Sequence, residues 1–250
     1  MTAICSSSIG FSSSVGVSSS SSSSIKESYS SSLAKTNWTY LNPALSYGEI
    51  TDHRDGQVYK TTVIGSQTWM AENLNYIDTG AVRMGYSVCN AFLDSTCNGY
   101  AHLYTWSAAM KLDSAYCHKN ADAVIHTPHQ GICPSGWHIP TDAEWDTLEA
   151  YVKANNGGDS AGTSLKSPKS WKIFKNIPSG TDLFGFSAIA AGSLIPYGGY
   201  ANKGYDTIFW SADESSADTA QSRFLSFSDE SVISGGWSKT EEISVRCIED

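Results

Sequence analysis

The stretch DHRDGQVYKTTVIGSQTWMAENLNY, residues 52–76, does most to decide the fold. β-Branched and aromatic residues crowd into positions 58–64, and turn-forming residues lie on either side of that run. The pattern predicts one strand, a turn at Gly65 and Ser66, and a second strand. We therefore expect a hairpin that opens the folded part of the chain.

A second stretch, GICPSGWHIPTDAEW at residues 131–145, predicts the start of a helix. Thr141 and Glu144 have the spacing of a capping box, in which each side chain bonds the other residue's backbone amide. Trp145, Leu148 and Val152 follow at helical spacing, and the Asn and Gly residues at 155–158 predict the end of the helix. A weaker helical pattern covers residues 103–112. Short strands are expected within residues 182–200, 206–212, 222–228 and 242–248.

The first fifth of the chain has a different composition. Seventeen of the first 32 residues are Ser, and almost nothing apolar is present to offset the entropy of ordering them. We interpret residues 1–50 as a flexible low-complexity tether and residues 51–250 as one domain.

Together with SVRCIED at residues 244–250 and GYAHLYTWSAAM at residues 99–110, these stretches resemble the Fibrobacter succinogenes major paralogous domain. This family consists of secreted or surface-attached bacterial modules. WHIPTDAEW and SVRC also resemble segments of the formylglycine-generating-enzyme branch of the C-type lectin-like fold. The resemblance implies an α+β, C-type lectin-like domain with two main helices, small antiparallel sheets and long loops. A β-sandwich with a decorating helix is the alternative.

Six cysteines occur without a CxxC pair, which favours disulfides over a zinc site. Cys89 and Cys97 enclose a loop short enough for a local bond. The lectin-like resemblance implies a bond between Cys133 and Cys247, and it leaves Cys117 over.

Cys5, ahead of the Ser-rich tether, has two interpretations. It is either a bacterial lipid anchor or an incidental linker cysteine, free or paired with Cys117. With the resemblance, this tether predicts an extracellular or outer-surface protein, which the first interpretation of Cys5 would anchor to a lipid.

Composition also excludes several functions. The net charge of −9 and the lack of basic runs argue against nucleic-acid binding. No apolar stretch reaches the roughly 18 residues that a transmembrane helix needs. Chemistry of the formylglycine-generating type needs a close cysteine pair, and no cysteine lies between Cys133 and Cys247. We therefore expect no enzyme, no cofactor and no metal. A calcium site at Asp213, Glu214 and Asp218 and a glycoside hydrolase with two carboxylates are weaker alternatives.

A binding module remains the best hypothesis from sequence. The segment IPYGGYANKGYDTIFW, residues 195–210, places several aromatic residues among glycines, and Trp237 follows two more glycines. We predict a ligand site with these members: Tyr197, Tyr200, Tyr205, Trp210 and Trp237. The expected ligand is a polysaccharide, with a surface protein or a structural role in an envelope complex as the alternative, and the expected state is a monomer.

Overall fold

The computed structural model describes residues 39–78, 87–88, 101–156, 160–175, 177, 179–196 and 199–250, with backbone alone at 87–88. The described part is an α+β structure with antiparallel strand pairing. Its helical elements are α1 (Trp106–Ala109), the 3₁₀ turn η1 (Ser114–Cys117), α2 (Asp142–Asn156) and α3 (Ala161–Leu165). Cys89 and Cys97 lie outside the described residues, as do Cys5 and most of the Ser-rich segment.

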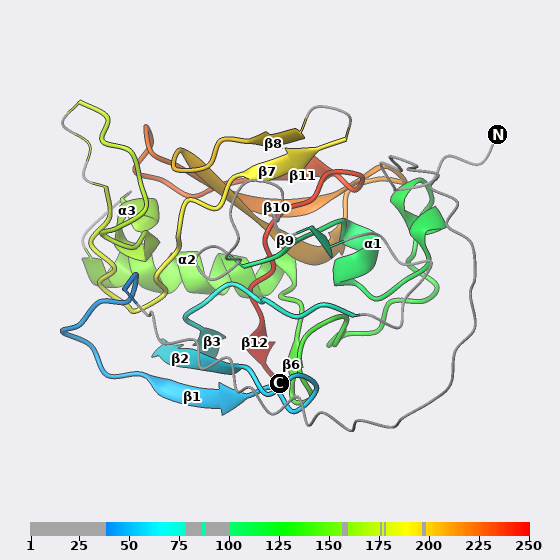
Figure 1. Cartoon of the computed structure of the whole chain (residues 1–250), viewed down its shortest axis with the longest axis horizontal. Coiled ribbons are helices and arrows are strands. Elements are labelled where there is room, and N and C mark those ends of the chain that lie inside the picture. The colour runs from blue at the N-terminus through cyan, green and yellow to red at the C-terminus, as the bar shows by residue number, and fades with distance from the viewer. Residues whose placement is uncertain are drawn as a thin grey trace, which may run out of the picture.

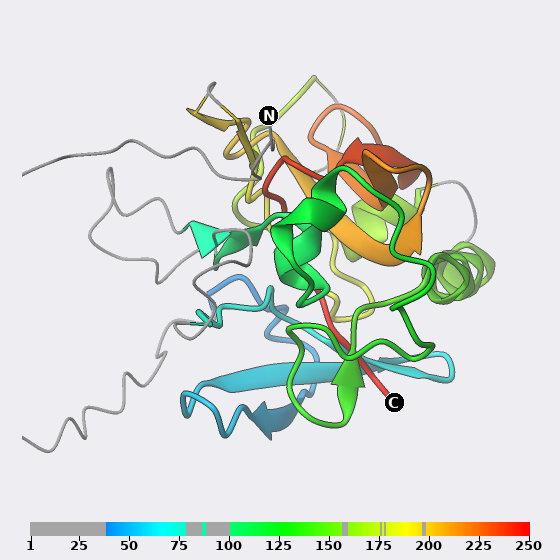
Figure 2. The same cartoon turned by 90° about the vertical axis from the view of Figure 1, so that its right-hand side faces the viewer.

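Two sheets dominate the arrangement (Figures 1 and 2). One has the order β1-β2-β3-β12-β6 and lies at the bottom of both views. The other has the order β11-β10-β9 and lies above it, and α2 is seen end-on at the right of Figure 2. The strands of the first sheet are β1 (Gly48–Thr51), β2 (Val58–Ile64), β3 (Gln67–Met70), β6 (Trp137–His138) and β12 (Ile248–Glu249). Those of the second are β9 (Asp206–Glu214), β10 (Thr219–Ser226) and β11 (Ile233–Ser238). Two small pairs complete the set: β4 (Ser87–Val88) with β5 (Leu103–Tyr104), and β7 (Ser193–Ile195) with β8 (Gly199–Ala201).

The predicted opening hairpin is confirmed. β2 pairs with β3 in antiparallel register, with Ile64 opposite Gln67 across the turn. Gly65 has a φ of +65°, and a Cβ at this position would lie 2.8 Å from the ring of Tyr151. The turn therefore needs glycine both for its backbone conformation and for its close contact with α2.

The predicted capping box is confirmed as well. The amide of Thr141 donates to Glu144 Oε2 at 2.8 Å, and the amide of Glu144 donates to Thr141 Oγ1 at 3.3 Å. The apolar side of α2 is buried, and the Trp145 ring lies 4.8 Å from that of Trp69 on β3. The capping box thus starts a helix that packs against the first sheet.

Two expectations about local structure were wrong. Residues 103–112 form the two-residue strand β5 and a single turn, α1, so α2 is the one long helix among the described residues. In residues 242–248 only Ile248 belongs to a strand, and isolated bridges such as Phe209 with Ser244 hold the rest. Cys117, for which the sequence left the partner open, is disulfide-bonded.

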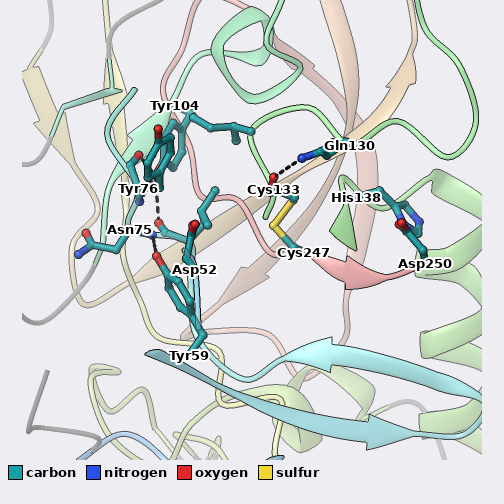
Figure 3. The surroundings of a disulfide bond; sticks show 12 residues. Asp52, Tyr59, Asn75, Tyr76, Tyr104, Gln130, Cys133, His138, Cys247 and Asp250 are labelled. Atoms are coloured by element: carbon teal, nitrogen blue, oxygen red, sulfur yellow. Dashed lines mark hydrogen bonds and ion pairs between the residues drawn. A yellow bond between two sulfur atoms is a disulfide. The ribbon is translucent and has the colours of Figure 1, made fainter. Parts of the chain in front are cut away.

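The bond between Cys133 and Cys247 is present, with an S–S distance of 2.01 Å (Figure 3). It joins the loop before β6 to the segment that leads into β12. His138 lies close by, between two carboxylates: its Nδ1 is 2.8 Å from Asp250 Oδ1, and its Nε2 is 2.9 Å from Glu144 Oε1. His138 therefore links β6 to the capping box of α2 and to the residue after β12.

This histidine makes stability depend on pH. Burial lowers the pKa of His138, but the hydrogen bonds to Glu144 and Asp250 outweigh burial and raise the pKa above its ordinary value. Because this pKa is raised, the two ion pairs of His138 contribute fully to the free energy of unfolding below about pH 6.5. That contribution is lost as the pH rises through the folded-state pKa. We expect His138→Gln to cost about 1 kcal/mol at about pH 5.5, and less at about pH 8.5.

Urea unfolding of both proteins at the two pH values checks this expectation. His118→Gln is the control, because His118 forms a similar contact with Asp218 at a half-exposed site. An equal or larger cost at the higher pH would show that the His138 ring is neutral in the folded protein.

Candidate ligand-binding face

Trp210 was predicted to lie at the ligand site, but in the structure it is not at the surface. Its side chain is fully buried, and its indole N–H donates to the carbonyl oxygen of Tyr104 at 2.7 Å. Strand alternation places Ile208, Trp210 and Ala212 on one face of β9, and all three belong to the same buried cluster. Trp210 is therefore a core residue and not a ligand residue.

The predicted tyrosines lie in different surroundings. Tyr197 is outside the described residues. Tyr200 on β8 is half-buried, and its hydroxyl donates to the carbonyl oxygen of Ala191, which fixes the β7–β8 hairpin. Tyr205 is 42% exposed, and its ring packs edge-on against Phe227 at 5.0 Å. Tyr200 thus has a structural contact, whereas Tyr205 joins a small exposed ring cluster.

Trp237 on β11 is the predicted residue with the most suitable surroundings. Its half-buried ring lies nearly parallel to that of Phe224, with 6.3 Å between the ring centroids and 14° between the planes. Its indole N–H donates to Glu241 Oε2 at 2.8 Å. Both rings are partly buried and pack against the core cluster that contains Trp210 and Ala220. Their remaining exposed parts and one carboxylate therefore lie together at the margin of this core.

The register of β10 and β11 explains this grouping. Phe224 lies opposite Ile233, Ser222 opposite Gly235, and Ala220 opposite Trp237, so these residues share one face of the sheet. Gly235 contributes no side chain to the middle row, and a Cβ placed there would have no atom within 4 Å. We call this surface the Trp237 face. Its members are Phe224, Ile233, Gly235, Trp237 and Glu241.

Phe224 and Glu241 were not among the predicted ligand residues. Phe224 alternates with the buried Arg223 and Leu225 along β10, and this two-residue period is visible in the sequence. Its partner strand was not predicted, however, so the face that Phe224 shares with Trp237 could not be inferred.

Glu241 gives the Trp237 face an acceptor group. Burial raises the pKa of the Glu241 carboxyl, and the hydrogen bond from Trp237 offsets part of that shift. The hydroxyls of Ser238 and Thr240 lie 2.9 Å from each other in the same turn. The face therefore combines an apolar ring surface with hydrogen-bonding groups at its border.

The candidate calcium residues are already engaged in other contacts. Glu214 accepts from the ammonium of Lys239 and from the amide of Ala121, the latter at 2.7 Å. Asp213 accepts from the amide of Asp142, and Asp218 contacts His118. Within the described ranges, no group of three or more His, Cys, Asp or Glu residues is placed to hold a metal ion. No helix in the same ranges is long and apolar enough to cross a membrane.

A concave surface, separate from the Trp237 face, lies between β2 and the loop around Leu183. Its volume is about 380 Å³, and its lining is mostly apolar: Leu45, Ser46, Gly48, Thr61, Thr62, Val63, Leu183 and Phe184. Val63 is 71% exposed and Leu183 is 51% exposed. No charged group lines this hollow, so it offers little that would orient a polar ligand.

The fold is thus an α+β domain with an internal disulfide. The Trp237 face, with its two rings and one carboxylate, lies at the edge of the upper sheet. Residues 63–249 match the family model of the Fibrobacter succinogenes major domain, and the chain belongs to this family. Comparisons with curated proteins and with solved structures give no match.

Proposed function

We propose that this protein is a bacterial surface or secreted module that binds polysaccharide through the Trp237 face. The observation that carries the proposal is the pair of nearly parallel, partly buried rings of Phe224 and Trp237 at the margin of the core, with Glu241 bonded to the indole. Aromatic rings present a flat apolar surface that suits the C–H face of a sugar, and Tyr or Trp adds a polar tip. A carboxylate beside the rings accepts hydrogen bonds from sugar hydroxyls.

Charge narrows the ligand class to neutral polysaccharides. The chain carries a net charge of −9, and the one ionisable group on the Trp237 face is an acid. Both features disfavour an acidic polymer such as pectin. Cellulose, xylan and mixed-linkage glucans lack that repulsion.

The proposed fold is C-type lectin-like, and the proposed location is the outer cell surface, with Cys5 as a possible lipid anchor. A disulfide from the loop before β6 to the segment before β12, and a last strand inside the first sheet, support this fold. In such folds, the loops before the last strand commonly form the ligand face. Residues 233–241 occupy this position in the chain. No catalytic step is proposed.

A protein ligand is the second candidate, and the hollow lined by Val63 and Leu183 favours it. Both side chains are apolar and more than half exposed, which is typical of a surface that another protein covers. The two candidates use different surfaces, so variants at each surface separate them.

Trp237→Ala is expected to weaken binding to a neutral polysaccharide about tenfold or more, because truncating an aromatic anchor commonly costs over 1 kcal/mol. Titration calorimetry or affinity electrophoresis with soluble xylan and β-glucan measures the effect, with polygalacturonate as the acidic comparison. The oxidised full chain should be used with and without EDTA, and EDTA should have no effect.

Tyr151→Ala is the matched control, since Tyr151 is also a half-exposed aromatic residue but lies on α2. The melting temperature of each variant must stay near that of the parent protein. Equal affinity of the Trp237 variant and the parent protein, or a loss confined to the Tyr151 variant, would place the ligand elsewhere. Binding lost in Leu183→Ala instead would favour the protein-ligand candidate.

A further inference from the structure

Strand β11 forms an unprotected edge of the upper sheet. The sheet order β11-β10-β9 leaves one side of β11 without a neighbouring strand among the described residues. Its first four residues are exposed, and its sequence ISGGWS contains no charged residue and no proline. Natural proteins commonly use such residues to block pairing at a free edge. Within the part of the chain that the structure describes, the edge of β11 is therefore open to pairing with another strand.

Two contacts show which backbone groups point to the free side. The Ser222 hydroxyl donates to the carbonyl oxygen of Gly235 at 2.9 Å, so that carbonyl faces β10. The amide of Lys239 donates to the carbonyl oxygen of Asp218 at 2.9 Å, which continues the same two-residue alternation. In an antiparallel pair, the next residues then point the other way. Ser234 and Gly236 thus direct their N–H and C=O groups to the open edge.

The two glycines of β11 are not needed for backbone conformation. Neither Gly235 nor Gly236 is among the residues of positive φ. Glycine inside a strand costs about 0.5–1 kcal/mol relative to alanine, and it often marks the close approach of another backbone or a ligand. The open space beside Gly235 fits this explanation, because nothing in the described chain lies within 4 Å of a Cβ built there.

We propose that β11 pairs with β11 of a second copy, antiparallel and about a two-fold axis at Gly236. The outward groups allow this register, in which Gly236 lies opposite the partner's Gly236 and Ser234 lies opposite the partner's Ser238. The carbonyl oxygen of Ser238 takes no part, because it accepts from the amide of Glu241 at 3.0 Å within its own copy. One step further along the strand, Trp237 comes opposite the partner's Gly235. Each indole then lies over the open space beside Gly235 of the other copy.

This self-complementarity is the reason to choose a second copy over an unrelated peptide. Trp237, the largest side chain of β11, meets the partner's Gly235, which has open space beside it. The two-fold axis makes the same contact a second time. Symmetry brings no like charges together within residues 233–238, because that stretch has none. Lys239 follows it, but this side chain is buried and bonded to Glu214. The structure thus points to a dimer in place of the monomer expected from sequence.

Dimerisation also extends the Trp237 face. The rings of Phe224 and Trp237 in one copy would continue into the same pair in the other copy, across one six-stranded sheet. The dimer does not require polysaccharide binding. Trp237 takes part in both, so a variant at Gly236, which is not a member of the Trp237 face, is the one that separates them.

Sedimentation equilibrium of the full chain between roughly 1 and 500 µM, at about 0.15 M ionic strength, tests the proposal. The parent protein is expected to dimerise. Gly236→Pro removes an outward N–H that β10 does not use, and it should raise the dissociation constant at least tenfold. Gly235→Val adds a side chain where the protomer has open space, so it should block the dimer without lowering the melting temperature.

Val63→Ser is the control for nonspecific association, because it removes an exposed apolar side chain from another surface. It should leave the dissociation constant unchanged. A parent protein that stays monomeric over the whole range, or dimers that survive both glycine substitutions, would overturn the proposal. Polysaccharide binding by the monomeric Gly236→Pro variant tests the Trp237 face separately, since its two rings remain in place.

Discussion

Arg223→Ala is expected to lower the free energy of unfolding by about 3 kcal/mol. Arg223 on β10 has a fully buried side chain that contacts three acids of α2. Its Nη2 donates to Asp146 Oδ1 at 2.6 Å and its Nε donates to Glu149 Oε1 at 2.9 Å, while Nη1 donates to Asp142 Oδ1. Removing the guanidinium leaves a cavity. It also leaves three carboxylates on the same side of α2 without the cation that they share.

The size of this loss follows from the burial of the partners. Glu149 is 11% exposed, whereas Asp146 is 69% exposed and recovers water when the arginine is removed. The expected loss is therefore near the low end of the range of about 3–5 kcal/mol for a broken buried ion pair. Like-charge neighbours at spacings of three and four residues add a few tenths of a kcal/mol.

Urea unfolding at neutral pH measures the Arg223 effect, with Lys153→Ala as the matched control. Lys153 also contacts Glu149, at 3.4 Å, but from an exposed position, so its loss should cost about 0.5 kcal/mol or less. Arg223→Met keeps most of the side-chain volume and separates the lost charge from the cavity. A loss below about 1 kcal/mol in the alanine variant would mean that water replaces the guanidinium at little cost.

The sequence predicted correctly the helix and the hairpin that are determined by residues close together in the chain. The opening hairpin follows from a run of β-branched residues next to Gly65, and α2 follows from the reciprocal bonds of Thr141 and Glu144. In both cases, residues within a few positions of one another determine the conformation. The tertiary environment did not need to be known.

Elements that depend on distant partners were not predicted. β11 contains two glycines and forms because β10 offers a partner, and the helical pattern at residues 103–112 gave way to the pairing of Tyr104 with Ile243. Trp210 has a loop of aromatic residues before it in sequence, but strand alternation turns it into the core. Trp210 is thus buried, whereas Phe224 and Glu241 lie beside Trp237 through the sheet register and were not predicted together with it.

The pairing of Cys133 with Cys247 came from a family resemblance, since six cysteines do not define their own connectivity. Replacing both cysteines with alanine is expected to cost about 4 kcal/mol, because the bond closes a loop with a sequence separation of 114 residues. The strand that it holds has little other support: β12 has two residues, and Ile248 is the one that pairs with both β3 and β6. Loss of the bond should therefore free the last strand from the middle of the first sheet.

Unfolding of the double variant in urea, with non-reducing peptide mapping of the parent protein, measures this contribution. The double variant is a sharper test than a reductant, which would also break the bond of Cys117. Hydrogen exchange should show the loss first at Met70 and Leu74, whose amides donate to the carbonyl oxygens of Cys247 and Val245. Uniform destabilisation with full protection at these two amides would mean that the bond acts only on the unfolded chain. Free thiols at both positions in the parent protein would contradict the disulfide itself.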